Sequence, residues 1–155
     1  MHTTPQERLK KLGYELPAVP APAGSYVPAV RSGNLIFTAG QLPLQEGRLH
    51  TRGRVGEEVS IEEAREAARI CALNALAAAA EQASGLDKIS RIVRVGGFVA
   101  SAPGFERQPE VLNGASELLG TIFGEAGTHA RTAVGVCALP FGSPVEVELV
   151  VEVSG

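Results

Sequence analysis

The sequence predicts a single α+β domain in which helices cover one face of a β-sheet. Two helical segments, residues 60–85 and 110–124, lie among segments with the period-2 pattern of strands. The expected order is two strands, a short third strand, a helix, a strand, a helix and two final strands. With 155 residues, of which 45% are hydrophobic and 20% charged, the chain can bury one core without disulfide or metal support.

The first 24 residues are expected to form a helix and a connector that precede the main domain of residues 25–155. Thr4, Pro5 and Glu7 have the form of a capping box with proline at the first helical position, and Gly13 is a natural stop. The following stretch is rich in proline, which disfavours both helix and central strand. We therefore expect an extended connector there.

The next elements follow from turn residues and caps. Gly33 and Asn34 separate two β-rich runs within residues 25–44, which predicts a hairpin, and residues 47–58 are expected to be loop with one short strand. Ser60 and Glu63 form a second capping box, and Gly85 is the expected cap at the far end of this helix. Its many alanines predict that another element packs closely against it.

The second half alternates strand and helix. Gly96 and Gly97 within the strand at 89–100 indicate a bulge or a close approach. A loop leads to the helix at 110–124, which Gly124 ends. Two strands, 131–138 and 145–152, then flank the turn at 139–144.

Charge and composition exclude several classes of function. The net charge is −3, the 14 basic residues are scattered, and the chain has no Trp and two Tyr, so a nucleic-acid surface is not expected. The amino terminus resembles no signal peptide, and no apolar run is long enough for a membrane span. A cytoplasmic protein is expected.

The sequence also lacks the residue patterns that metal sites and reactive thiols require. His2, His50 and His129 show no ligand spacing, and no nucleotide-binding motif is present, so no metal or cofactor is implied. Cys71 and Cys137 are too few for a disulfide framework, and reduced thiols are expected. His129 is too distant from Cys137 along one strand to form a catalytic dyad, and we interpret Cys137 as a small buried hydrophobe.

One charged residue stands out in the strand at 131–138. Arg131 lies on the same face of this strand as small residues, Ala133 and Gly135 among them. Because an arginine stays charged, it needs an anionic partner, a ligand or water. Two interpretations are possible: Arg131 lines a pocket for a small anion, or it forms an ion pair with a glutamate of a neighbouring strand.

The final strand has one apolar face and one acidic face. A solvated sheet face is the simplest interpretation of the acidic side, and a subunit interface or a binding site are the alternatives. If the last two strands formed a simple hairpin, Glu152 would lie near Arg131 and Glu146 near Cys137.

Three stretches, "YVPAVRSGNLIFTAGQLPL", "IVRVGGFVAS" and "ARTAVGVCALP…VEVE", resemble the reactive intermediate deaminase family, RidA/YjgF, across residues 25–153. The resemblance is to a longer branch of that family with an N-terminal extension. It implies a chorismate-mutase-like fold with one mixed sheet and two main helices on one face, assembled as a homotrimeric barrel with clefts between subunits.

The resemblance also implies a chemistry and a site. Family members hydrolyse 2-imino or 2-enamino acids to 2-keto acids and ammonia without a cofactor, as 2-iminobutanoate/2-iminopropanoate deaminases do. By motif position, Arg131 would hold the substrate carboxylate and Glu146 would orient or activate water. The expected substrate-binding positions are Tyr26 as a wall, the backbone N–H groups of Ala39 and Gly40, and Asn113 and Ala133.

Two positions depart from the family pattern. Many members have a serine where Ala39 stands and a cysteine where Ala133 stands, so the cleft is expected to be more apolar here. The alternatives to the enzyme are a non-catalytic trimeric module that binds small carboxylates or 2-keto acids and, least favoured, an endoribonuclease or translation inhibitor.

Overall fold

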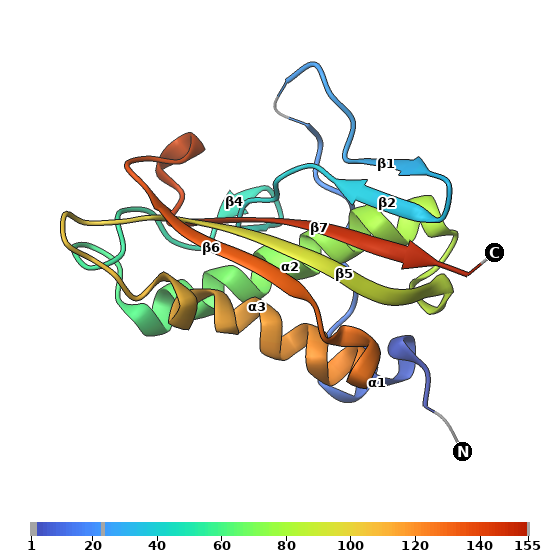
Figure 1. Ribbon diagram of the computed structural model, residues 1–155. Helices are drawn as coiled ribbons and strands as arrows, with labels where there is room; N and C mark the ends of the chain where they lie inside the picture. The colour runs from blue at the N-terminus through green and yellow to red at the C-terminus, as the bar shows by residue number, and fades with distance from the viewer. Residues whose placement is uncertain (1–2, 23, 155) are drawn as a thin grey trace.

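Two long helices lie on one face of a five-stranded sheet in the computed structural model, which describes residues 3–22 and 24–154 (Figure 1). The strand order is β1-β2-β7-β5-β6. The strands are β1 Ala29–Ser32, β2 Leu35–Thr38, β7 Val145–Val153, β5 Ile89–Ala100 and β6 Ala130–Val136. The long helices are α2 Ile61–Ala83 and α3 Gln108–Phe123. The predicted α+β fold with a mixed sheet is confirmed.

Smaller elements complete the fold. A short helix α1, Pro5–Lys11, begins at the predicted Thr4 capping box. A two-stranded ladder pairs β3 Leu44–Gln45 with β4 Arg48–Leu49. Three 3₁₀ turns are η1 Leu86–Lys88, η2 Gly124–Gly127 and η3 Pro140–Gly142.

The first hairpin has the predicted geometry. Ser32 pairs with Leu35, so Gly33 and Asn34 form the two-residue connection, and Gly33 has a φ of 62° that suits such a turn. Strand β2 then pairs antiparallel with β7, which lies at the centre of the sheet. The amino-terminal hairpin therefore lies beside the carboxy-terminal strand through β2.

The last two strands do not form a hairpin. Strand β6 pairs in parallel with one side of β5, and β7 pairs antiparallel with the other side. The chain reaches β6 from β5 through α3, and after β6 it crosses the end of β5, where the Ala100 N–H donates to the Pro144 carbonyl. The hairpin register that would place Glu152 near Arg131 and Glu146 near Cys137 is therefore wrong.

The long helix α2 begins at the predicted capping box. The Ser60 hydroxyl accepts from the Glu63 N–H, and the Glu63 carboxylate accepts from the Ser60 N–H. At the other end the left-handed cap is Ser84, with a φ of 65°, rather than Gly85. Gly85 follows with a φ of 135°, which also favours glycine, so the helix ends one residue earlier than expected.

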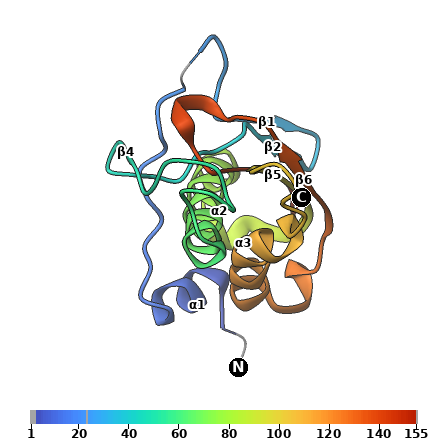
Figure 2. The same ribbon diagram turned by 90° about the vertical axis from the view of Figure 1, so that its left-hand side faces the viewer.

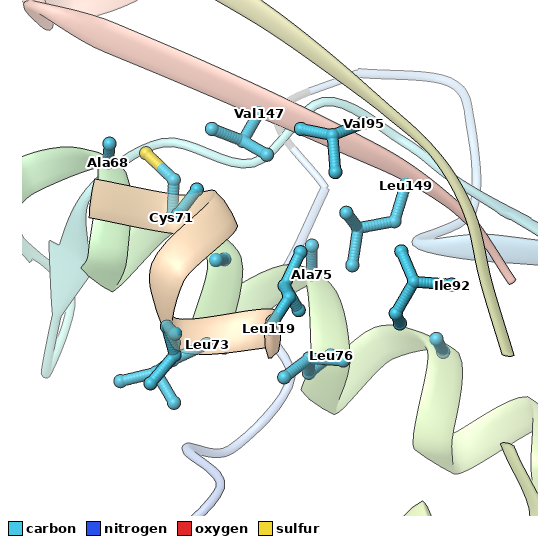
Figure 3. Close-up of a cluster of buried hydrophobic side chains, with 14 of the residues drawn as sticks. Ala68, Cys71, Leu73, Ala75, Leu76, Ile92, Val95, Leu119, Val147 and Leu149 are labelled. Atoms are coloured by element: carbon cyan, nitrogen blue, oxygen red, sulfur yellow. The ribbon is translucent and has the colours of Figure 1, made fainter. Parts of the chain in front are cut away.

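The core lies between the two helices and the sheet. Figure 3 shows side chains of α2 and α3 facing side chains of β5 and β7, among them Ala75, Leu76, Leu119, Val95 and Leu149. All five residues are buried. Burial of this apolar face of the sheet and the facing helix surfaces supplies most of the stability of such a layered fold.

The alanines of α2 permit close helix packing, as predicted. Gly114 of α3 lies directly against the backbone of Arg65 in α2, and a Cβ added at Gly114 would overlap the Arg65 carbonyl oxygen. Glycines in β5 also reflect close approach: a Cβ at Gly97 would overlap Leu112 of α3, and one at Gly96 would lie 2.8 Å from Glu148 Cγ. The register shifts of β5 fall earlier in the strand, between Ile89 and Arg94.

The N-terminal segment packs on the same structure. Leu9 of α1 is fully buried and belongs to the core cluster. After α1 the connector runs beside α2 toward the loops at the far side of the sheet (Figure 2). Among the described residues, no helix combines the length and apolar character required to cross a membrane.

Replacing Gly114 with alanine tests the helix contact. We expect Gly114→Ala to lower the free energy of unfolding by about 1–3 kcal/mol, because the new methyl group forces α3 away from the α2 backbone. Chemical denaturation followed by circular dichroism measures the change.

Gly120 of the same helix is the matched control. A Cβ there meets no atom within 4 Å, so Gly120→Ala is expected to raise the free energy of unfolding by up to about 1 kcal/mol through helix propensity. Equal effects of the two substitutions would contradict the packing account.

Candidate functional site

Arg131 lies on the helix-covered face of the edge strand β6. Its Cα partner in β5 is Val95, which is fully buried under the helices, and paired residues in a sheet direct their side chains to the same face. The side chain therefore leaves the sheet on the side of α3.

Three neutral oxygens of α3 accept hydrogen bonds from the Arg131 guanidinium. Nη1 donates to Asn113 Oδ1 at 2.8 Å and to Ser116 Oγ at 3.1 Å, and Nη2 approaches the Pro109 carbonyl at 3.4 Å. Within residues 3–22 and 24–154, Arg131 forms no salt bridge. The ion pair that the sequence left open is absent from the described chain, and the cation is oriented without being neutralised.

A second residue pair continues this network. Ser116 Oγ lies 2.9 Å from His129 Nε2, and His129 Nδ1 lies 2.6 Å from the Gly127 carbonyl. A carbonyl only accepts, so in the neutral ring Nδ1 carries the hydrogen and Nε2 accepts from the serine hydroxyl. Arg131 thus donates to Ser116, Ser116 to His129 and His129 to the Gly127 carbonyl. In such a series of hydrogen bonds each bond polarises the next.

The sequence analysis did not identify Ser116 and His129 as residues of the network that orients Arg131. Cys137 was expected to be buried, but it is exposed, because β6 ends at Val136 and Cys137 lies in the turn that follows. Two spacings carried the signal: His129 is two residues from Arg131, and Ser116 is three residues from Asn113 on one helix face. Neither spacing by itself says that strand and helix face each other.

Ala133 continues the face of β6 that carries Arg131. It pairs with Gly97 and packs partly buried against the core. The floor beside Arg131 is therefore apolar and small. We call Arg131, Asn113, Ser116 and His129 the cation half-site.

Glu146 lies on the other face of the sheet. It alternates in β7 with Val145 and Val147, which are buried under the helices, so its carboxylate is on the face that no helix covers. The carboxylate rests against Gly40, where any Cβ would overlap it. Gly40 is thus the residue that makes room for Glu146.

The loop beside Glu146 contains the other predicted positions. The Ala39 N–H donates to the Pro28 carbonyl at 2.8 Å, so the expectation that it serves a ligand carboxylate is wrong. The Gly40 N–H donates to no acceptor in the part of the chain that the structure describes. Tyr26 is half exposed and lines a cavity together with Gly40. We call Glu146, Gly40 and Tyr26 the acid half-site.

The two half-sites are separate within one chain. Strand β5 lies between β6 and β7, and Arg131 and Glu146 extend from opposite faces of the sheet. Glu152 is on the Glu146 face as well. Neither glutamate meets Arg131 in the described chain.

The environment of Glu146 favours its protonated form. Burial raises the pKa of Glu146 above its ordinary value, and the nearby negative charge of Glu148 raises it further. Because the folded pKa is raised, the native state binds this proton more tightly than the unfolded chain. This carboxyl therefore makes the fold less stable as pH rises from its ordinary pKa through its raised pKa.

No metal centre accompanies these groups. Among the described residues, which exclude His2, no three His, Cys, Asp or Glu side chains are grouped so that they could hold a metal ion. The chemistry available is that of a cation, a partly buried carboxyl and backbone donors.

Replacing Glu148 tests the cause of the Glu146 shift. In Glu148→Gln we expect the pKa of Glu146 to fall toward its ordinary value, because one like charge is removed while burial remains. Titration of the Glu146 carboxyl carbon by ¹³C NMR measures it. Glu152→Gln, on the same face of β7, is the control and should leave the pKa of Glu146 unchanged.

Comparisons with known proteins cover nearly the whole chain. The model of the family described as "YjgF/chorismate_mutase-like, putative endoribonuclease" matches residues 6–153. Protein TCP17 of Trypanosoma cruzi is 43% identical over 147 residues, which are 94% of this chain and 92% of that protein.

Two solved structures share the fold closely. The protein Atu1372 of Agrobacterium tumefaciens, of unknown function, is 45% identical with a TM-score of 0.90, over 97% of this chain and 92% of that one. A "putative endoribonuclease" of Shewanella oneidensis MR-1 is 36% identical with a TM-score of 0.94, over 97% of this chain and all of that one. The chain therefore belongs to the RidA/YjgF family.

Proposed function

We propose that the cation half-site of one copy meets the acid half-site of another, and that this composite site hydrolyses 2-imino acids to 2-keto acids and ammonia. The observation that carries the proposal is Arg131, a charged group held by three oriented but neutral acceptors. A substrate carboxylate is the planar anion that a guanidinium binds best. Membership of the RidA/YjgF family supports the same chemistry.

The open face of the sheet supports assembly. Val30, Phe37 and Val134 are large apolar side chains that stand exposed on it, on three of the five strands. Exposed apolar residues spread across one face indicate a surface that binds protein. A ring of copies, for which we propose three, would cover this face and bring β6 of one copy beside the acid half-site of the next.

The residues suggest how the reaction would proceed. Arg131 and its network hold the substrate carboxylate, and Glu146 in its ionised form takes a proton as water adds to the imine carbon. Glu146 returns that proton to the nitrogen, which gives a carbinolamine. It then takes the hydroxyl proton and delivers it to the amine nitrogen, so that the carbonyl forms as the carbon–nitrogen bond breaks and ammonia leaves. One water is consumed, one ammonia is released, and the glutamate ends as it began.

The local polarity fits an activated substrate. An imine carbon next to a carboxylate is already electrophilic, so the site needs charge neutralisation and one positioned water more than a strong nucleophile. With Ala133 apolar and the Ala39 N–H engaged, the Gly40 N–H is the backbone donor beside Glu146 that has no acceptor within the described residues. The acidic net charge and the carboxylates of the open face disfavour an RNA ligand there.

The Arg131→Ala variant tests the assignment. An amino-acid oxidase releases the imine of 2-aminobutanoate, semicarbazide traps it, and the protein competes with the trap. We expect wild type to reduce trapping and Arg131→Ala to lose about 100-fold or more of this activity, because the carboxylate loses its charge-assisted hydrogen bonds.

Lys88→Ala is the control, since Lys88 is an exposed cation outside both half-sites. It should behave as wild type, and size-exclusion chromatography should show the same assembly for all three proteins. Undiminished turnover by Arg131→Ala would refute the assignment. Stabilisation of wild type by 2-oxobutanoate without turnover of any imine would replace the enzyme with a binding module.

A further inference from the structure

A cavity of about 600 Å³ opens beside the acid half-site. Four separate segments of the chain form its walls: the connector at Pro20, Ala21 and Pro22, the stretch from Tyr26 to Pro28, the loop and ladder from Gly40 to Arg52, and Phe141. Gly40 lines this cavity and also supports the Glu146 carboxylate. The cavity therefore begins where the proposed chemistry occurs.

Hydrogen bonds hold these walls in place. The buried Asn74 of α2 donates from Nδ2 to the carbonyls of Leu42 and Leu44, at 3.0 and 2.9 Å. Gln41 and Val147 exchange two backbone hydrogen bonds, which fix the same loop to the central strand. The cavity is thus built on α2 and β7 rather than on loops alone.

A third contact fixes the opposite wall. Nη1 of Arg52 donates to the Phe141 carbonyl at 3.0 Å, which ties the turn between β6 and β7 to the wall that carries the ladder. This bond uses one nitrogen of the guanidinium. Nη2 and Nε form no hydrogen bond within the described residues, so they are able to bind a ligand.

The lining is apolar with charge of one sign. Proline, alanine and leucine side chains and Phe141 make up most of the surface, and the charged residues among the lining are Arg48 and Arg52. Among the residues that the structure describes, no carboxylate lines the cavity. A ligand with an apolar body and an anionic end would match both features.

We propose that this cavity receives the substrate's side chain and selects 2-imino acids whose side chain is extended, apolar along its length and anionic at its end. This inference rests on the proposed function, because the reacting carbon must lie at Gly40 and Glu146. The N-terminal segment of residues 1–24 then acts in recognition, since Pro20 to Pro22 form one wall.

Two keto acids of equal length provide the probes. 2-Oxoadipate carries a distal carboxylate where 2-oxohexanoate carries a methyl group, and each resembles the product of the proposed reaction. Isothermal titration calorimetry measures binding of both to the intact assembly. Inhibition of 2-iminobutanoate turnover measures the same preference at the site of reaction.

We expect wild type to bind 2-oxoadipate about tenfold or more tightly than 2-oxohexanoate, since a charge-assisted hydrogen bond is worth about 1.5–3 kcal/mol. Arg48→Gln should reduce this preference, and Arg48→Gln combined with Arg52→Gln should remove it without weakening 2-oxohexanoate. Arg54→Gln is the matched control, an exposed arginine outside the lining, and should keep the preference.

The outcomes separate this inference from the proposed function. Loss of turnover with a retained, arginine-dependent preference in calorimetry would refute the deaminase and leave the cavity as an anion site. Turnover of 2-iminobutanoate without any preference between the two keto acids would refute the cavity inference alone. A preference that survives the double substitution would also refute it.

Discussion

The parallel pairing of β6 with β5 determines where the charge of Arg131 lies. Because Arg131 pairs with Val95, which is buried under the helices, its side chain is directed onto α3 and is held there by Asn113 and Ser116. The same pairing keeps β7, and with it Glu146, on the other side of β5. Within the described residues, a cation without a carboxylate partner and a carboxyl with a raised pKa are therefore kept apart in one chain, as the proposed composite site requires.

Both half-sites depend on glycines, because the missing side chains leave space for neighbouring groups. Gly40 leaves space for the Glu146 carboxylate, and Gly96 leaves space for the neighbouring Glu148. On the helix side, Gly97 leaves space for Leu112 of α3, and Gly114 allows α3 to pack against the backbone of α2. These two contacts position α3, which carries the residues that orient Arg131. Packing and site geometry depend on the same close approaches.

Local signals in the sequence predicted local structure well. Capping boxes at Thr4 and Ser60 and the turn at Gly33 and Asn34 depend on residues close in sequence, and each was found in the structure. The partner of β6 could not be predicted in this way, because a period-2 pattern defines the faces of a strand and not its neighbour.

The same reason explains the site. Arg131, Asn113 and Glu146 were recognised from motif positions, but only the fold shows that Arg131 meets Asn113 and not Glu146. The Ala39 N–H was expected to be available, but Pro28 and Ala39 continue the register of the β1–β2 hairpin, so this N–H is used in pairing the two chain segments. The contact between Ser116 and His129 could not be predicted either, because it depends on how α3 lies against the segment that leads into β6.

The central claim is that one site needs two copies of the chain, and mixing two inactive variants tests it most directly. Arg131→Ala lacks the cation half-site and Glu146→Gln lacks the acid half-site, and subunit exchange can be followed by native mass spectrometry. If the interfaces are head to tail, random mixing of equal amounts leaves about a quarter of the sites with both residues, so imine turnover should return to about a quarter of wild type. A mixture that exchanges subunits yet stays as inactive as either variant would contradict the account.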